Sequence, residues 1–451
     1  MKHPGTHPLT TWPTPRSTIA WRHQDAISCG RFLADVMALA PTLPERRHVI
    51  NICSDRYLFL VGFAAALVRR QITLLPPSRV TGVVVGIAAE YDDCYLLADT
   101  HVGDGALLSF CLTLPAQPPA FKGAVPAIEL ERIAAIVFTS GSTGRATANI
   151  KPWRTLVEGA RLNAITQLAH QDPSVTLVAT VPAQHMYGFE TTIMLPLMGR
   201  CAIHCGRPFY PEDVRQALAE VPQPRILVTT PVHLRALAAS TAQMPAASGI
   251  WSATAPLSVE LATRSEHLFQ APLQEIFGCS EAGTFATRLT SRDVAWQLYD
   301  AFRMVPENHG ALLYADHLPQ PVCLHDSVEM LDRRHFRVVG RTTDLVNIAG
   351  KRASLGDLNA RLLSIPGVRD GVIFMPEVPA ESEPIRTAAM VVAPGMTRAQ
   401  VLGALRELID SAFLPRPLVM VDVLPRNETS KLPRAAMLQH FAEYAGTSGN
   451  E

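Results

Sequence analysis

The chain has 451 residues, a length typical of two to four domains, and its 48% hydrophobic content is enough for large buried cores. The 40 Lys and Arg residues balance the 40 Asp and Glu residues, so the overall charge gives no basis for a nucleic-acid or membrane-surface partner. Any anion that the protein binds is therefore expected to bind at a local site.

The first residues, MKHPGTHPLTTWPTPRS, are polar and rich in proline, and no apolar segment follows a positive start. This pattern argues against a secretory signal. The longest strongly apolar run, residues 57–68, is shorter than the ~20 residues of a membrane helix. We therefore expect a soluble, cytoplasmic protein without a membrane partner.

Strands and helices alternate from residue 48 onward. HVINIC is an apolar run of strand type, and SDRYLFLVGFAAALVRR begins with a capping-type pair and continues as a buried helix. QITLLPPSRV and TGVVVGIAAE then have the composition of further strands. This order predicts βαβ units on a parallel sheet.

A second set of alternating elements follows. Strands are predicted at AAIVFT, VTLVATVP, RCAIHC and RILVTT, and helices near residues 152–169, 187–198, 211–220 and 231–239. Cys201 and Cys205 flank His204 in this set, but no further ligands stand at metal-binding spacing. The favoured interpretation is that these cysteines belong to a buried strand.

The pattern changes after about residue 300. GALLYAD, PVCLHDSVEML and HFRVVGR are predicted as short antiparallel strands, followed by a mixed order with helices at 355–364, 397–412 and from 433. The fold class is therefore α/β: a large N-terminal domain of βαβ subdomains with short antiparallel strands (1–340), a hinge (341–344) and a small mobile α+β domain (345–451).

The most informative stretch is IVFTSGSTGRATANIKPW, residues 136–153, in which a strand leads into a loop of Thr, Ser and Gly. Closely spaced backbone N–H and hydroxyl groups in such a loop can bind phosphate. Two common phosphate motifs do not match: Arg145, not Lys, follows Gly144, and two glycines are too few for the dinucleotide fingerprint.

Seven patches occur in an order that resembles the adenylate-forming superfamily of acyl-CoA synthetases, aryl acid ligases, luciferases and peptide-synthetase adenylation domains. They are TSGSTG, HMYGF, WSATAPLS, FGCSEAG, HDSVEML, VGRTTDLVNIAGKR and LPRNETSK, and the resemblance spans about residues 48–434. The resemblance implies that the protein activates a carboxylic acid with ATP as acyl-AMP and then transfers the acyl group to a thiol.

By this resemblance, the β and γ phosphates of ATP are held by a loop made of Thr139, Ser140, Gly141, Ser142, Thr143 and Gly144. The family usually ends this loop with Pro-Lys, where this chain has Ala146 and Thr147. Two residues, Arg145 and Lys151, are candidates for the missing positive charge, and the sequence does not choose between them.

The resemblance also assigns the adenine and metal site. Phe277 would stack on adenine next to Gly278, Ser280 would stand beside the α-phosphate in place of the usual Thr, and Glu281 would bind Mg²⁺. The acyl pocket would be bordered by two patches, whose residues are His185, Tyr187, Gly188, Ala253, Thr254 and Ala255. We assign His185 to substrate lining or gating and not to proton transfer.

The remaining matches lie in the C-terminal third. Asp326 would accept the ribose hydroxyls, Arg341 would assist there, and Thr343 stands where the family often has a pivot Asp. Gly350 would let a pantetheine arm pass, with Arg352 nearby. Lys431, in LPRNETSK, would supply positive charge in the first step, with Ser430 replacing the usual Gly.

The implied cofactors are ATP, Mg²⁺ and a pantetheine thiol donor, either CoA or a phosphopantetheinyl acyl carrier protein. No Asp stands in the HMYGF segment for a substrate ammonium, and Glu190 follows too late for a match, which favours an aryl or fatty acid over an amino acid. We favour a small aryl acid such as a hydroxybenzoate. A fatty acid ligase, a nucleotide-binding regulatory protein with a decayed site and a luciferase-like oxidase remain alternatives.

Overall fold

The computed structural model describes residues 5–101, 107–140, 146–169, 171, 174–199, 201–307, 310–341, 345–348, 351–376, 386–427 and 431–445. The chain packs as two compact units. One comprises Met1–Asp293 and Ala315–Pro319, and the other comprises Val294–Tyr314 and Gln320–Glu451. A hinge is a prediction about domain motion, and residues 342–344 lie outside the described residues. The hinge at 341–344 and the division into domains 1–340 and 345–451 therefore remain predictions.

The first unit holds a six-stranded sheet of order β10-β9-β5-β4-β6-β7, parallel except for the β9–β10 pair. Its strands are β4 (His48–Asn51), β5 (Ile72–Leu75), β6 (Cys94–Ala98), β7 (Ser109–Cys111), β9 (Ile133–Ser140) and β10 (Ala146–Pro152). The helices around it are α1 (Cys29–Leu39), α2 (Arg56–Val68), α3 (Thr81–Glu90) and α4 (Trp153–Gln167), with a 3-10 turn η1 (Ala40–Thr42).

A second sheet in this unit has the order β16-β15-β14-β13-β11-β12-β2-β3 and is parallel from β2 to β15. Its strands are β2 (Thr18–Arg22), β3 (Asp25–Ser28), β11 (Thr176–Ala179), β12 (Ala202–His204), β13 (Arg225–Thr229), β14 (Gly249–Ser252), β15 (Leu273–Cys279) and β16 (Gly283–Arg288). A small pair joins β1 (Thr6–Pro8) to β8 (Ala127–Glu129).

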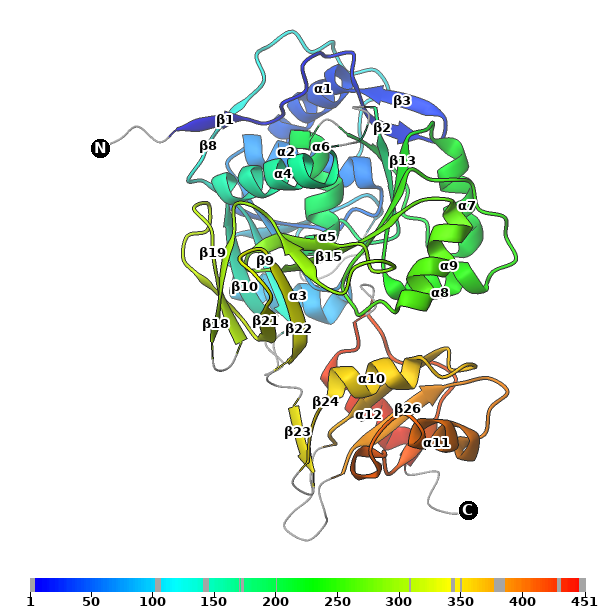
Figure 1. Cartoon of the computed structure of the whole chain (residues 1–451). Helices are drawn as coiled ribbons and strands as arrows, with labels where there is room; N and C mark the ends of the chain where they lie inside the picture. Colours follow the sequence, from blue (N-terminus) through cyan, green and yellow to red (C-terminus); the bar gives the residue numbers. More distant parts are fainter. Residues whose placement is uncertain are drawn as a thin grey trace. The chain divides into compact units, whose positions relative to one another are not determined.

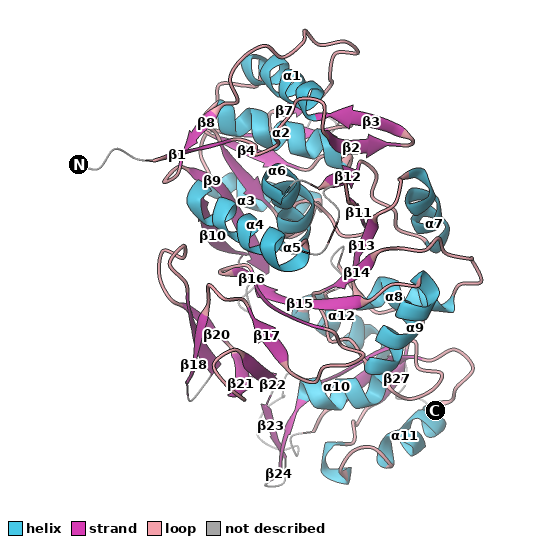
Figure 2. Ribbon diagram, turned by 45° about the horizontal axis from the view of Figure 1, so that its top comes forward, coloured by secondary structure: helices cyan, strands magenta, loops and turns pink. Residues whose placement is uncertain are grey.

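The connecting helices of the second sheet are α5 (Met186–Phe189), the π-helical segment Glu190–Met194, α6 (Leu195–Gly199), α7 (Pro211–Glu220), α8 (Pro231–Ala239) and α9 (Val259–Phe269). Helix α1 packs on α2 and α4 on α6 (Figure 1), while α8 packs on α9 and α7 lies beside β11 (Figure 2). The largest core includes fully buried Phe32, Phe59, Trp153 and the edge-to-face pair of Phe63 and Phe189, whose centroids are 5.0 Å apart.

The second unit is built from short strands and three longer helices. The strands are β17 (Trp296–Leu298), β18 (Arg303–Glu307), β19 (Gly310–Tyr314), β20 (Val322–Leu324), β21 (Asp326–Met330), β22 (His335–Arg341), β23 (Leu345–Ile348), β24 (Lys351–Ser354), β25 (Asp370–Phe374), β26 (Ala388–Val392) and β27 (Leu418–Met420). The helices are α10 (Leu355–Leu363), α11 (Arg398–Arg406), η4 (Ser411–Phe413) and α12 (Arg434–Ala445). The predicted α/β class, with short antiparallel strands and an α+β C-terminal region, is confirmed.

One predicted strand is wrong: residues 81–90 form helix α3. The run of β-branched residues suggested a strand, but only Val84 and Ile87 are buried, and their spacing of three is that of a helix face. The segment connects β5 to β6 on the far side of β4, and parallel strands require a crossover connection of this kind. Topology therefore overrides local propensity here.

Candidate functional site

The Thr/Ser/Gly loop joins two strands. The strand β9 pairs antiparallel with β10, with Ser140 opposite Ala146 and Thr139 opposite Thr147. The strand β10 lies between the loop and the predicted helix near residues 152–169, which is observed as α4 from Trp153. The predicted phosphate residues 141–144 and Arg145 lie outside the described residues, and Ser140 is described only in its backbone.

The candidate Lys151 lies on β10 and is only 2% exposed. Its Nζ donates a hydrogen bond to the main-chain oxygen of Glu281 at 2.7 Å. Burial lowers the pKa of this lysine, and the negative charge of Glu190 partly opposes that effect. Lys151 therefore contacts the main chain of the predicted metal residue from the interior of the unit, and its side chain does not face solvent.

The FGCSEAG patch forms the turn between β15 and β16. Phe277 pairs with Ala286 next to a bulge at Gly278, and its ring contacts Phe285 with centroids 5.1 Å apart. The half-buried Ser280 follows, and Glu281 is exposed. The turn therefore presents an accessible carboxylate, while its main chain is held from inside the unit.

The two predicted acyl-pocket patches lie side by side. Tyr187 is buried in α5 and donates a hydrogen bond from Oη to the main-chain oxygen of Trp251 at 3.0 Å. Gly188 makes a close approach, because a Cβ there would lie 2.0 Å from the oxygen of Pro182. His185 stands at the N-cap of α5. The HMYGF segment is thereby bonded to the strand that leads into SATAPL.

The SATAPL loop contains an unusual backbone conformation. Thr254 has φ +83°, a region that β-branched residues rarely occupy and that often marks a functional loop. It lies between buried Ala253 and half-buried Ala255. The Oγ of Ser252 and Oγ1 of Thr254 are buried, and neither has a hydrogen-bond partner within the described part of the chain.

Sequence reasoning missed the anchor of the HMYGF segment. Arg56, at the start of α2, is 1% exposed and donates to the oxygens of Ala179 and Val181 at 2.9 Å each, and to Oγ1 of Thr192 at 2.8 Å. These bonds hold the chain on both sides of residues 185–189. A single arginine within an otherwise apolar helix was the available sequence signal.

Glu190 was also missed as a site-supporting residue. Its Oε1 accepts a hydrogen bond from the N of Thr284 at 3.2 Å and its Oε2 accepts one from Oγ1 of Thr284 at 3.0 Å. It begins a π-helical segment, a rare irregularity that is frequent at functional sites. A lone acid in the apolar run MYGFETTIMLPL was the signal.

In the second unit, two predicted ribose residues are brought together. Asp326 begins β21 and pairs in register with Arg341 at the end of β22, although only the backbone of Arg341 is described. The backbone of Arg352 lies in β24 opposite Asn347. Gly350 and residues 342–344 lie outside the described residues, so their predicted roles remain predictions.

Lys431 is exposed, and its main chain is hydrogen-bonded to Asn427. Its N donates to Oδ1 of Asn427 at 2.9 Å, and the N of Asn427 donates to its main-chain oxygen at 2.8 Å. The neighbouring Arg426 donates two hydrogen bonds to the carboxylate of Asp370, at 2.7 Å each. This two-bond ion pair fixes one end of the segment that carries Lys431 to β25.

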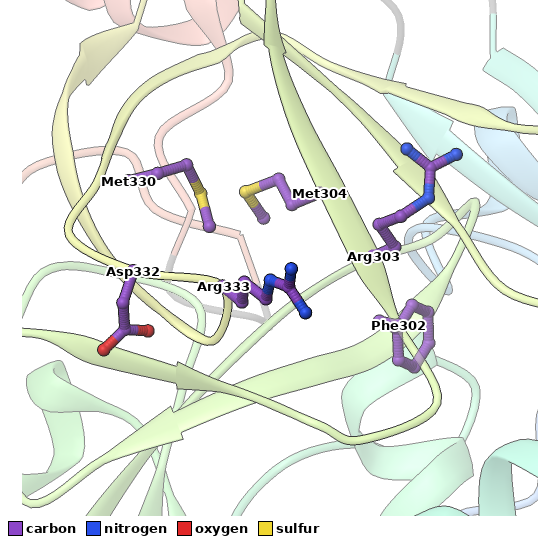
Figure 3. A pocket seen from close by; sticks show the side chains of 6 residues that line it. All are labelled: Phe302, Arg303, Met304, Met330, Asp332 and Arg333. Carbon is purple, nitrogen blue, oxygen red and sulfur yellow. The ribbon is translucent and has the colours of Figure 1, made fainter.

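One hollow is lined by none of the predicted site residues. It has a volume of about 570 Å³ and lies in the second unit, lined by Phe302, Arg303, Met304, Met330, Asp332 and Arg333. Figure 3 shows the Met304 and Met330 side chains pointing toward one another across it. The carboxylate of Asp332 is engaged by its own turn, accepting from the N of Arg334 and of His335, at 2.7 Å each.

The cysteines at 201 and 205 are free and buried, which confirms that they belong to a buried strand region. His204 between them contacts Oε2 of Glu220 at 2.9 Å. Within the described ranges, no group of three or more His, Cys, Asp or Glu side chains is placed to hold a metal ion. In the same ranges, no helix is long and apolar enough to cross a membrane.

A family model described as AMP-binding enzyme matches residues 36–310, more than half of the chain. The chain belongs to the AMP-binding enzyme family. This membership confirms the predicted adenylate-forming superfamily and the prediction of an enzyme. The predicted phosphate loop, the FGCSEAG turn and both acyl-pocket patches of this AMP-binding enzyme fall within the matched residues.

Individual relatives agree with this assignment. A 4-coumarate–CoA ligase of Halorhodospira halophila is 32% identical over 237 residues, covering 50% of this chain and 55% of that one. The phosphinothricin tripeptide synthetase PhsC of Streptomyces viridochromogenes is 26% identical over 388 residues, covering 74% of this chain and 34% of that one. This chain therefore corresponds to only part of the length of these relatives.

Solved structures share the fold. The ATP-bound MatB from Rhodopseudomonas palustris has a TM-score of 0.74 and 17% identity, covering 96% of this chain and 97% of that one. At that identity the likeness concerns the fold alone, and it extends over both units.

Proposed function

We propose that this AMP-binding enzyme is an ATP-dependent carboxylic acid ligase that forms an acyl-AMP intermediate and transfers the acyl group to a pantetheine thiol. The observation that carries the proposal is the family match over residues 36–310, in which the turn of Glu281 presents an exposed carboxylate. The activity, the substrate and the acceptor are all parts of this proposal.

The residues of the turn fit a magnesium–nucleotide complex. Mg²⁺ is usually bound by one or two carboxylates together with substrate phosphates, and Glu281 is an exposed carboxylate of this kind. When bound, Mg²⁺ would neutralise phosphate charge near the site of attack. Phe277 would contact the adenine, and Asp326 with Arg341 would take the ribose.

For the first step, the substrate carboxylate is already ionised at neutral pH and needs no general base. Two anions meet when it approaches the α-phosphate, so positive charge there stabilises the transition state. Lys431, whose main chain is hydrogen-bonded to Asn427, would supply that charge. His185 would line or gate the acyl pocket.

For the second step, the C-terminal domain would turn about residues 341–344. This domain rotation would withdraw Lys431 from the site and bring the segment around Gly350 and Arg352 to it, so that a pantetheine thiol reaches the acyl-AMP. Thioester formation releases AMP. The acceptor would be CoA or the phosphopantetheine arm of an acyl carrier protein.

The substrate that we favour is a small aryl acid such as a hydroxybenzoate. Glu190 is engaged with Thr284, so it is not placed to bind the ammonium of an amino acid. The buried hydroxyl groups of Ser252 and Thr254 would suit a polar substituent better than an alkyl chain, because buried polar groups usually have partners. The name of the coumarate ligase relative also points to an aryl acid.

The test is pyrophosphate release with ATP and Mg²⁺ across benzoates, cinnamates, fatty acids and amino acids. We expect release with one acid class and its loss in Lys431→Ala. The matched control is Arg434→Ala, which removes a nearby exposed cation and should keep activity. Adding CoA or a phosphopantetheinylated carrier protein to the active acid would then identify the acceptor.

Two outcomes would contradict the proposal. ATP binding without pyrophosphate release for any acid would favour a nucleotide-binding regulatory protein. The departures from the family pattern at Ala146–Thr147, Ser280, Thr343 and Ser430 would then explain the loss of catalysis. Oxygen uptake that follows acyl-AMP formation would favour a luciferase-like oxidase.

A further inference from the structure

Two buried charged residues lie beneath the turn that carries Glu281. Lys151 is 2% exposed and Glu190 is 6% exposed. Charged side chains are seldom buried to this extent without partners, because removal from water costs several kcal/mol per ion. Their presence in one place therefore calls for a specific role.

The hydrogen bonds of both residues converge on the same turn. The side chain of Lys151 makes one hydrogen bond within the described part of the chain, from Nζ to the main-chain oxygen of Glu281 at 2.7 Å. Glu190 accepts from the N and Oγ1 of Thr284, at 3.2 and 3.0 Å. The turn is thus held at two points three residues apart, one by a cation and one by an anion.

The contact with Glu190 also explains a glycine. Gly283 has φ +75°, and a Cβ at this position would lie 2.3 Å from Oε1 of Glu190. The carboxylate therefore packs directly against the main chain of the turn. Each charge acts on the other: burial raises the pKa of Glu190 and lowers that of Lys151, and the opposite charge counteracts each change in part.

The two anchors come from different parts of the first unit. Lys151 lies on β10, which begins directly after the phosphate loop, whereas Glu190 lies at the start of the π-helical segment after α5. The lysine thus connects the strand that leaves the phosphate loop to the turn that bears the predicted metal carboxylate.

We propose that Lys151 and Glu190 are positioning residues that hold the turn 279–284, so that the carboxylate of Glu281 is presented to the magnesium–nucleotide complex in one place. This inference rests on the proposed function for the identity of the complex. Lys151 acts through the main chain of Glu281 and not on phosphate, because its side chain is enclosed. It is therefore not a substitute for the missing loop lysine.

The experiment compares Lys151→Met, Glu190→Gln and the double variant with the wild type. Lys122→Met, which removes an exposed lysine of the same unit, is the control. Binding of a fluorescent ATP analogue is measured against Mg²⁺ concentration, together with thermal unfolding. This readout needs no turnover.

For half-maximal binding of the ATP analogue, we expect each single variant to need at least about tenfold more Mg²⁺ than the wild type. Losses of this size are typical when a residue that orients a metal ligand is replaced. Binding of the analogue without Mg²⁺ should change little. The double variant leaves no unpaired buried charge, so it should unfold closer to the wild-type temperature than the single variants, with its Mg²⁺ dependence still shifted.

An unchanged Mg²⁺ dependence in the folded double variant would overturn the inference and leave the two residues a purely structural role. If the wild type binds the analogue with Mg²⁺ but releases no pyrophosphate, the proposed function fails while this comparison still decides the positioning role. If Mg²⁺ does not affect binding by the wild type, the positioning role fails.

Discussion

Replacing Arg56 should remove the hydrogen bonds that hold the chain on both sides of the HMYGF segment. The Arg56 guanidinium is fully enclosed and donates three hydrogen bonds, to the oxygens of Ala179 and Val181 and to Oγ1 of Thr192. Arg56→Met keeps much of the side-chain volume but removes all three bonds. Two buried main-chain oxygens then lose this donor.

The magnitude follows from these contacts. A hydrogen bond from a charged donor contributes about 1.5 kcal/mol at the lower end, so three contribute roughly 4–5 kcal/mol. Part of this is offset, because methionine does not need to be removed from water as a guanidinium does. We expect the free energy of unfolding of the first unit to fall by roughly 3 kcal/mol.

Urea unfolding followed by tryptophan fluorescence measures this change, since four of the five tryptophans, all except Trp296, lie in the first unit. The matched control is Arg22→Met. Arg22 is 44% exposed and pairs with Asp55 at 2.6 Å, and such surface pairs contribute less than about 1 kcal/mol. Equal losses for Arg56→Met and Arg22→Met would refute the anchoring role.

Three further predictions concern other parts of the molecule. Asp370→Asn removes the carboxylate that holds Arg426, five residues before Lys431, so pyrophosphate release should slow by about tenfold in kcat with little change in KM for ATP. A change in KM alone would contradict this. Burial lowers the pKa of His233 to about 4 from 6.5, so the unfolded chain takes up the proton first as the pH falls. Stability should therefore decrease between about pH 6.5 and 4 by roughly 3 kcal/mol, and pH-dependent urea unfolding of His233→Gln should lack this component. Gly188→Ala places a Cβ 2.0 Å from the oxygen of Pro182, so the chain must shift, costing about 1–3 kcal/mol and raising KM for the acid; an unchanged melting temperature and KM would show that the loop adapts freely.

Local patterns in the sequence were sufficient for much of the fold. The capping pair before α2 and the apolar periodicity predicted this helix, and a proline at the first helical position fits α7 and α8. The seven patches in order identified the superfamily, because each motif is a local run of residues whose chemistry does not depend on distant contacts. The same local information misassigned residues 81–90, where the need for a crossover between parallel strands decided the outcome.

The supports of the site could only come from the tertiary structure. The sequence identified Lys151 as a cation near the phosphate loop, but its hydrogen bond to Glu281 joins residues 130 positions apart. The bonds of Arg56 and Glu190 likewise join distant segments. Motif spacing in the sequence indicates which residues carry the chemistry. It does not indicate which residues hold them in place, because a buried charged side chain needs hydrogen-bond partners and these can come from any segment that the fold brings next to it.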